Sequence, residues 1–456
     1  MIRRCVVALY RGQISRSLVL LFVMSILATA SVYAQDAVRP SLAGQDAAEA
    51  RQEDVSRIPY NLLMGPVRFR VGATLGAEYN DNVNYAEVNE IDDFIITPSL
   101  TLDAIWPVTQ LNTLRLDLGI GYSFYLDHSE FNTDSILIAP RSQLALDIFV
   151  GDFRINIHDR FQLQQDPIQQ GALSNVADYG RFENYAGISV LWDLNKVLLQ
   201  VGYDHYNYLS TTDRFDYINH NSDIVYGSAA YIVNPTLTVG VEGNAVFTYY
   251  DQNSGSEVLN DNDEYSVGGF LELAVTSNLK VRAAGGYQRM DFDRGFVIFP
   301  VATPIGTFVL PTPDHKHLED YYVNGLIGHR INAQLSQTLS AGHENQLGIQ
   351  SNYITLNYVR HTLTWNLIRN VLLSTEFFYE EAEESGGPLN ATLFTVLTGQ
   401  QTGETFSRIG GAITLGYQLT PHVTLGLRYQ GTSKDSNVFL RDYNQNRISI
   451  DGTYSF

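Results

Sequence analysis

The sequence has a single cysteine, Cys5, and little positive charge: 29 Lys plus Arg stand against 49 Asp plus Glu, a formal net charge of −20. One cysteine excludes a disulfide scaffold and a multi-cysteine zinc site. The acid excess disfavours nucleic-acid binding, which needs Lys and Arg to neutralise phosphates. Charged residues reach only 17%, whereas Tyr (28), Phe (22) and Gly (36) are abundant. This composition is unusual for a soluble enzyme and typical of membrane β-proteins.

Long apolar runs are also missing. Residues 18–28 (LVLLFVMSILA) form an apolar segment too short to span a bilayer comfortably, and no apolar run of eighteen follows it. A basic start, this segment and the small residues of Val32-Tyr33-Ala34 predict a signal peptide over residues 1–34, cleaved after Ala34. An uncleaved N-terminal anchor is the alternative. Residues 35–66 are polar and Ala-rich, and we interpret them as a periplasmic N-terminal tail.

From Val67 to the last residue the chain alternates between apolar and polar side chains. In Arg68–Tyr79 one face carries Phe, Val, Ala, Leu, Ala and Tyr, and the other Arg, Arg, Gly, Thr, Gly and Glu. Leu114–Tyr125 shows the same split. A period of two over such lengths predicts strands with one apolar and one polar face.

Short and long connections also alternate along the chain. The short turns centre near Thr109, Gly151, Asn195, Asn234, Asn278, Leu335, Arg369 and Pro421. Eight short turns predict nine hairpins and hence eighteen strands; poor alternation around His343 and Arg360 leaves sixteen open. Pro98 and Pro140 lie inside presumed strands, where a missing N–H disfavours pairing, so we expect a bulge at each.

The fold class predicted from these patterns is all-β: a transmembrane antiparallel up-and-down β-barrel over residues 67–456, with short periplasmic turns and long outer loops. Lipid requires closure of such a sheet, because an open edge leaves backbone groups unpaired. A soluble sandwich would need at least two domains, yet no linker-like break follows residue 67. The expected location is the outer membrane of a Gram-negative bacterium.

The segment Asn61–Asn84 reads NLLMGPVRFRVGATLGAEYNDNVN, with an acidic-Asn turn at Tyr79-Asn80-Asp81-Asn82-Val83. With Gly119-Ile120-Gly121-Tyr122 and the terminal Tyr454-Ser455-Phe456, it resembles the putative beta-barrel porin 2 family. The resemblance covers residues 61–456 loosely and implies a Gram-negative outer-membrane barrel. It also implies that Tyr454 and Phe456 form the terminal signal read by the barrel-assembly machinery. Some family members are placed near exopolysaccharide export.

Inward-facing charges are the first candidate functional groups. A basic sector is expected on the first, third to fifth and last three strands: Arg68, Arg70, Arg115, Arg141, Arg154, Arg160, Arg408, Arg428 and Arg447. An acidic sector is expected to face it: Glu183, Asp204, Glu242 and Glu272. Opposed charge rows across a pore would sort polar solutes. The alternative is that these charges hydrate the lumen or pair with neighbours such as Asp103, Asp117, Asp147 and Asp451.

Inward aromatics and two apolar loops complete the candidates. The aromatics could form a stacking track for sugar rings, although filling of the barrel is the commoner role: Tyr125, Phe149, Tyr185, Tyr206, Tyr208, Phe270, Tyr322 and Phe378. The loops Asp291–Glu319 and Glu383–Glu404 are unusually apolar. Long exposed apolar loops would be adhesive. We expect them to pack among the loops, to constrict the lumen or to bind a partner.

Signatures of enzymes and metal sites are mostly absent. The sequence lacks GxSxG, HExxH and GxxxxGK[ST] motifs. The acidic run Asp251–Glu264 has Asn262 where an EF-hand requires Glu. His315 and His317 are a weak metal signal without a third ligand. We expect no catalysis, no metal and no cofactor.

The leading functional hypothesis is a channel for passive diffusion of small hydrophilic solutes, with sugars as one candidate class. The alternatives are an outer-membrane component of exopolysaccharide export and a structural, non-conducting barrel. Expected partners are outer-membrane lipid and lipopolysaccharide, the barrel-assembly machinery, and small polar solutes or polysaccharide.

Overall fold

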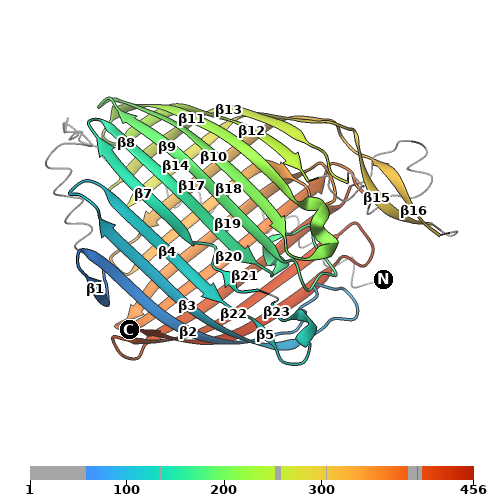
Figure 1. Ribbon diagram of the computed structural model, residues 1–456, viewed down its shortest axis with the longest axis horizontal. Helices are drawn as coiled ribbons and strands as arrows, with labels where there is room; N and C mark the ends of the chain where they lie inside the picture. The colour runs from blue at the N-terminus through green and yellow to red at the C-terminus, as the bar shows by residue number, and fades with distance from the viewer. Residues whose placement is uncertain (1–57, 134, 252–257, 304–305, 389–397, 399–402) are drawn as a thin grey trace.

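The computed structural model describes residues 58–133, 135–251, 258–303, 306–388, 398 and 403–456. The predicted signal peptide, its cleavage site at Ala34 and most of the predicted tail lie outside the described residues. Residues 62–64, at the end of that tail, form a short strand paired with the start of the next one. The described chain is almost entirely β-structure (Figure 1).

The strands are β1 (Leu62–Met64), β2 (Val67–Asn80), β3 (Asp93–Pro107), β4 (Thr113–Gly121), β5 (Phe124–Tyr125), β6 (Leu137–Ile138), β7 (Gln143–Val150), β8 (Phe153–Gln164), β9 (Arg181–Asp193), β10 (Val197–Ser210), β11 (His220–Asn234), β12 (Leu237–Tyr250), β13 (Asn262–Thr276), β14 (Leu279–Phe292), β15 (Phe296–Thr303), β16 (Gly306–Pro313), β17 (His317–Arg330), β18 (Leu335–Leu347), β19 (Tyr353–Ile368), β20 (Val371–Glu384), β21 (Thr405–Gln418), β22 (Val423–Ser436) and β23 (Tyr443–Ser455). Three short 3₁₀ helices accompany them: η1 (Ser129–Phe131), η2 (Pro167–Gln169) and η3 (Asp213–Ile218).

Within the described residues these strands form a closed antiparallel barrel of 18 strands, which confirms the predicted fold class. Closure is made by β2, which pairs with β3 on one edge and with the last strand, β23, on the other. The closing ladder runs from Gly72↔Ser455 to Asn80↔Arg447. Each barrel strand therefore has a partner on both sides, as lipid requires.

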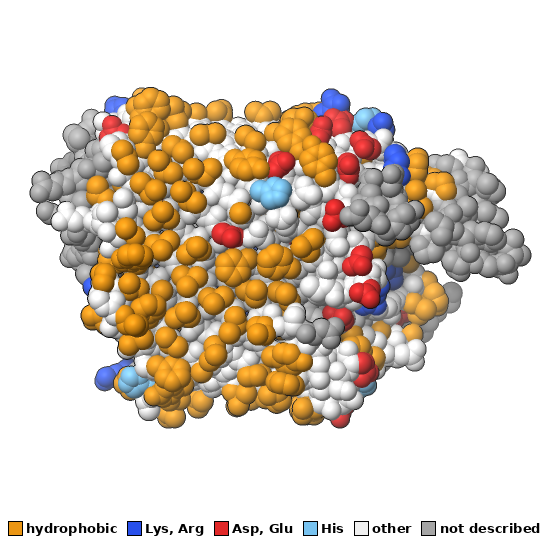
Figure 2. All heavy atoms as spheres, viewed as in Figure 1, with side chains coloured by type: hydrophobic (Ala, Val, Ile, Leu, Met, Phe, Trp, Pro, Cys, Tyr) orange, Lys and Arg blue, Asp and Glu red, His pale blue; other side chains and the backbone are white. Residues whose placement is uncertain are grey.

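The predicted alternation of faces is present in space. Apolar side chains such as Leu75 (60% exposed), Val201 (57%) and Val241 (58%) cover the outside of the barrel. Figure 2 shows this outer surface as predominantly apolar, with acidic side chains gathered toward one end. The lumen receives the polar half of each strand. We therefore identify the apolar surface with the lipid-facing surface of an outer-membrane barrel.

The connections at the barrel end opposite the acidic side chains are short turns. Asn195 and Asn370 both adopt a φ of 67° and Gly151 a φ of 56°, the left-handed region that tight turns need and that Asn and Gly tolerate best. Among the described residues no helix has the length and apolarity needed to cross a membrane.

Both strand prolines coincide with interruptions. Opposite Pro98, the strand neighbouring β3 is broken between Gly121 and Phe124, and the Tyr122 amide donates to the Pro98 carbonyl at 3.1 Å. Pro140 lies between β6 and β7, which pair separately with β4. Because proline cannot donate to the ladder, pairing is interrupted near each position: the neighbouring strand divides opposite Pro98, and the proline's own strand divides at Pro140.

Candidate functional site

The connection between β8 and β9, residues 165–180, folds across the outer mouth of the barrel. Its residues contact β21, β22 and β23, although β8 and β9 are the fifth and sixth barrel strands and β21–β23 the last three. We call residues 165–180 the inward loop. Its second residue is Asp166, whose side chain accepts from the Ile168 amide at 2.9 Å and so caps η2.

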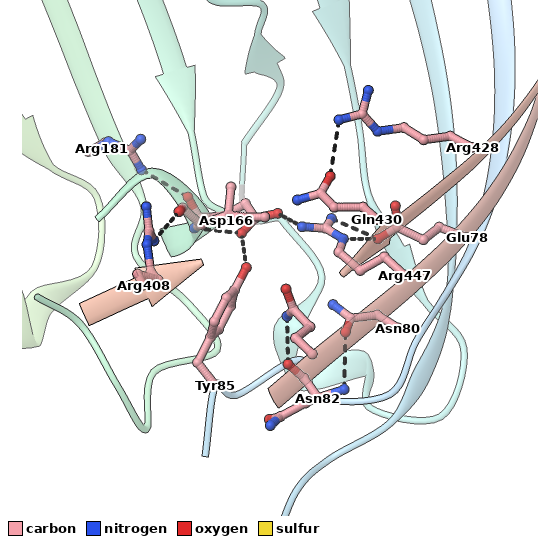
Figure 3. A network of polar contacts seen from close by, with 12 residues as sticks. Glu78, Asn80, Asn82, Tyr85, Asp166, Arg181, Arg408, Arg428, Gln430 and Arg447 are labelled. Carbon is pink, nitrogen blue, oxygen red and sulfur yellow. Dashed lines mark hydrogen bonds and ion pairs between the residues drawn. The ribbon is translucent and has the colours of Figure 1, made fainter. Parts of the chain in front are cut away.

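Asp166 is the centre of a polar network at this mouth (Figure 3). Arg447 of β23 lies with Nη1 2.6 Å from Asp166 Oδ2, and the Tyr85 hydroxyl donates to Asp166 Oδ1 at 2.5 Å. The same Arg447 contacts Glu78 of β2 at 2.7 Å. Burial alone would raise the pKa of Asp166, but Arg447 and the hydrogen bonds from Tyr85 and Ile168 outweigh it and lower that pKa below its ordinary value.

Two further arginines hold the backbone of the inward loop. Arg408 of β21 donates from Nη1 to the Ile168 carbonyl at 2.6 Å and pairs with Glu380 at 2.9 Å. Arg181 of β9, which is 1% exposed, donates to the Asp166 carbonyl at 3.2 Å. Arginines from three strands thus converge on a few consecutive residues, and we call this arrangement the arginine clamp (Arg181, Arg408 and Arg447).

The far half of the inward loop has a second anchor. Lys434 of β22 donates to the Ser174 hydroxyl at 3.2 Å and pairs with the fully buried Glu404 at 2.8 Å. Arg441 pairs with the other oxygen of Glu404 at 3.0 Å and also donates to the Ala172 carbonyl. A charge buried this completely is retained only when paired, so these contacts fix the loop position firmly.

An apolar cluster roofs the mouth beside the clamp. It joins buried residues of the inward loop, of β10, η3 and β15, and of the loop before β13: Leu173, Val176, Tyr179, Tyr208, Phe215, Ile218, Leu259, Val297 and Phe299. The Tyr179 and Tyr208 hydroxyls are 2.6 Å apart. Val297 and Phe299 belong to the apolar loop 291–319, so its described part packs among the loops. Most of the predicted apolar loop 383–404 lies outside the described residues.

Below the roof, the lumen holds a cavity of 1280 Å³. Its lining runs from the periplasmic turn residues Asn195 and Pro235 to Glu264 and His343 in the outer half of the barrel. Arg282 lies in its wall, 2.6 Å from Glu242 and 3.4 Å from Glu272, over the ring of Phe270.

The structure places a basic partner beside each residue of the predicted acidic sector. Glu242 and Glu272 share Arg282. Glu183 pairs with Arg181 at 3.0 Å, and Asp204 lies 3.1 Å from His158. Arg282 therefore offsets part of the negative charge of Glu242 and Glu272, and Arg181 offsets that of Glu183.

The nine arginines of the predicted basic sector have different surroundings. Arg68 lies over the ring of Tyr60, 5.2 Å from its centroid. Arg70, Arg115 and Arg160 are inward and exposed, and no described carboxylate forms a salt bridge with any of them. Arg154 and Arg428 are paired, with Asp147 at 3.0 Å and with Glu376 at 3.1 Å. Arg141 lies in the connection between β6 and β7, whereas Arg408 and Arg447 belong to the clamp. The lumen wall of β2, β4 and β8 therefore carries the most accessible positive charge.

Several predicted inward aromatics lie in contact. Tyr185 and Tyr206 stack with centroids 4.1 Å apart, and Tyr206 contacts Tyr208 at 6.2 Å. Tyr208 belongs to the buried roof, so this run leads from the half-buried lumen wall into packed side chains. Of these three residues, Tyr185 and Tyr206 offer ring surface to the lumen, and the predicted aromatics Phe270 and Tyr322 line the lumen cavity.

The described histidines near the predicted weak metal signal have separate partners. His315 contacts the Ser385 carbonyl at 2.6 Å, whereas His317 lies 2.7 Å from Asp291. The described residues hold no group of three metal-ligating side chains.

Sequence reasoning missed Tyr85, Asp166 and Arg181, and it interpreted Arg408 and Arg447 only as lumen lining. The Asp166-Pro167 pair is a local signal for a helix start. Nothing local indicates that this start lies against a strand 281 positions later.

Comparison with known proteins gives one family match and several distant structures. Residues 65–297 match the family model described as putative beta-barrel porin 2. No curated protein sequence matches the chain significantly.

Among solved structures, OpdQ of Pseudomonas aeruginosa is similar with a TM-score of 0.45 and 10% identity, over 86% of this chain and 98% of that one. OccK5 (OpdH) of P. aeruginosa is similar with a TM-score of 0.43 and 11% sequence identity, over 85% of this chain and 98% of that one. OccK2 (OpdF) of P. aeruginosa was solved in complex with glucuronate. It is similar with a TM-score of 0.43 and 10% sequence identity, over 85% of this chain and 98% of that one. At TM-scores this low, nothing about solutes follows for this chain.

Proposed function

The chain belongs to the putative beta-barrel porin 2 family and is a porin-like barrel of the Gram-negative outer membrane, and we propose that it passes small hydrophilic solutes by passive diffusion. The observation that carries this proposal is the lumen. It has a polar lining, a cavity of 1280 Å³ open among the periplasmic turns, and an inward loop fixed across its outer mouth. The proposal assigns the protein no reaction to catalyse.

The inward loop would set the limiting width of the channel. A loop held at both halves by charged side chains of the barrel and of its outer loops is a fixed obstruction, and a fixed obstruction selects solutes by size. The exposed arginines Arg70, Arg115 and Arg160 would then bias the selection by charge, favouring anions.

Sugars are the solute class that we propose for the lumen wall beside this loop. Tyr185 and Tyr206 form a stacked, half-buried aromatic pair, and the Tyr206 hydroxyl donates to Glu183 at 3.2 Å. A ring face next to charged hydrogen-bonding groups suits a sugar, which has an apolar face and a hydroxylated rim.

Planar-bilayer recording of the purified full-length protein tests the channel. We expect discrete conductance steps that neutral sugars of increasing size reduce progressively. A barrel that inserts, as shown by heat-modifiable migration on gels, but never conducts would contradict the proposal and favour the structural alternative.

A further inference from the structure

The ladder between β17 and β18 is incomplete. These strands pair from Arg330↔Ser336 to Val323↔His343 and then separate toward the outer end. On their other edges both continue: β17 pairs with β14 up to Asp291↔His317, and β18 with β19 up to Leu347↔Tyr353. The barrel wall therefore has a seam between residues 317–322 and residues 344–347.

Side chains close this seam where backbone pairing ends. Asp320 of β17 lies 2.9 Å from His343 Nε2 and accepts from Asn345 Nδ2 at 3.3 Å. Its other oxygen accepts from the Tyr321 amide at 2.8 Å. Gln288 of β14 donates to the Asn345 carbonyl at 3.2 Å. Nearer the outer end, Leu318 of β17 and Leu347 of β18 pack in one apolar cluster with Met290 of β14. Side-chain contacts thus replace a run of backbone hydrogen bonds, and such contacts rearrange more easily than a ladder.

The seam lies at the level of outward tyrosines. Tyr321 (55% exposed) is paired with Tyr287 (46%) on the lipid-facing side, and its ring stacks on His343 with centroids 4.3 Å apart. Tyrosines in this position mark the interface between hydrocarbon and headgroups. Unpaired strand edges are tolerated there, whereas within the hydrocarbon they are not.

The lumen cavity ends at the same seam. Gln288, Tyr322, His343, Glu344 and Asn345 all line it. The roof of loops covers the axial mouth beside it, with buried residues such as Tyr179 and Val297 at 1% and 0% exposure. A molecule in the cavity therefore meets packed loops along the axis. Sideways it meets the polar contacts of Asp320 and, toward the outer end of the seam, the apolar cluster that contains Leu318 and Leu347.

The charge around the cavity indicates what would pass. Its lining carries four carboxylates against two basic side chains: Glu242, Glu264, Glu272 and Glu344 against Lys196 and Arg282. Asp320 adds another carboxylate in the seam itself. A cationic group is favoured in such a lining, and the ring of Tyr322 offers it a π face. Outside, the apolar flank at Tyr321 and Val323 suits an alkyl chain.

We propose that the seam between β17 and β18 is a lateral portal through which an amphiphile with a positively charged head group moves between the outer leaflet and the lumen cavity. The Asp320–His343 contact closes the portal at rest. The head group exchanges this contact for the cavity carboxylates, while the alkyl chain stays against Val323 and Tyr321 until the head has entered.

Photolabelling of the full-length protein in phosphatidylcholine proteoliposomes tests the portal. The probe is a long-chain alkyltrimethylammonium with a diazirine in its chain, and mass spectrometry locates the label. The variant Tyr322→Cys/Glu344→Cys places two cysteines where the next rung of the ladder would be, so that oxidation locks the seam. We expect labelling of cavity peptides in the reduced variant, loss of that labelling on oxidation and recovery on reduction.

The matched control is Leu326→Cys/Ser340→Cys, a pair already joined by the ladder below the seam. Oxidation of this control should leave cavity labelling unchanged. Equal labelling of oxidised and reduced Tyr322→Cys/Glu344→Cys would overturn the portal, because the probe would then enter along the axis. Equal labelling by an alkyl sulfate of the same chain length would overturn the cationic head group. Conductance of the locked variant is recorded in parallel, so that failure of the portal and failure of the channel are distinguished.

Discussion

Arg447 and Asp166 are separated by 281 positions in the chain, yet Nη1 of the arginine lies 2.6 Å from Oδ2 of the aspartate. One residue belongs to the strand that closes the barrel, and the other lies near the start of the inward loop. Their contact therefore links barrel closure to the obstruction of the outer mouth.

Release of this contact should widen the channel. We expect Asp166→Asn to weaken the loop attachment by about 2 kcal/mol, because Arg447 keeps Glu78 but loses a second charged partner. Planar-bilayer recording should show larger and noisier conductance steps. Glu376→Gln is the control, since it removes a partner of Arg428 in the lumen without touching the inward loop. Unchanged conductance in Asp166→Asn would show that the loop does not limit the pore.

The same contact should respond to acid only at low pH. Asp166 has a pKa below its ordinary value of 3.8, so its contribution to stability is fully present above that value and is lost as pH falls through the lower pKa of the folded state. We expect steady conductance from neutral pH to about pH 5 and frequent large openings only below about pH 4. In Asp166→Asn this acid-induced step should be absent. If the conductance of the wild type changed near neutral pH instead, a titratable group other than Asp166 would control the opening.

The exposed lumen arginines should set ion selectivity. We expect Arg70→Gln/Arg115→Gln/Arg160→Gln to lower the chloride-to-potassium permeability ratio roughly twofold, because lumen charge attracts counterions. The reversal potential in a KCl gradient measures this ratio. Asp147→Asn/Arg154→Gln is the control, since it removes a lumen ion pair without changing the net charge. An equal reversal potential in the triple variant and the wild type would leave these side chains no role beyond hydration of the lumen.

The strands could be predicted from the sequence, whereas the mouth could not. Alternation is a local property, so the chain itself shows which face of Arg68–Tyr79 meets lipid and where Pro98 interrupts pairing. Poor alternation near His343 also marked the place where β17 and β18 separate. The contacts of Asp166 join a polar loop to residues hundreds of positions away, and polar loop residues carry no periodicity that would indicate a partner. The inward direction of Arg447 was predictable; the loop that it binds was not.

The roof should depend on buried apolar contacts of the hairpin β15–β16. Val297 is 0% exposed within the roof, and Val297→Ala should cost about 1–2 kcal/mol, enough to raise local opening roughly tenfold. Limited proteolysis of the protein in liposomes, with sites in residues 291–319 identified by mass spectrometry, measures this opening. Val323→Ala, on the lipid-facing surface at 49% exposure, should leave the cleavage rate unchanged. Equal rates in both variants would mean that the hairpin is held by contacts other than this cluster.

Substitution of Phe456 tests whether recognition by the assembly machinery can be separated from the stability of the folded barrel. Phe456 is 55% exposed, its amide donates to the Val71 carbonyl at 3.1 Å, and its ring meets Tyr454 edge-on at 5.1 Å. Since Phe456→Ala keeps the amide and loses little buried surface, we expect a cost of less than about 1 kcal/mol and normal refolding of the purified chain into detergent. In cells, however, a terminal aromatic read by the assembly machinery would matter, and the heat-modifiable, folded form in the outer membrane should fall severalfold. Phe439→Ala removes a still more exposed phenylalanine, at 85%, from an outer loop and should lower neither yield. The cellular yield could instead follow the refolding yield in the wild type, Phe456→Ala and Phe439→Ala alike. Phe456 would then act only through barrel stability, because loss of a recognition signal lowers assembly without lowering the stability of the assembled barrel.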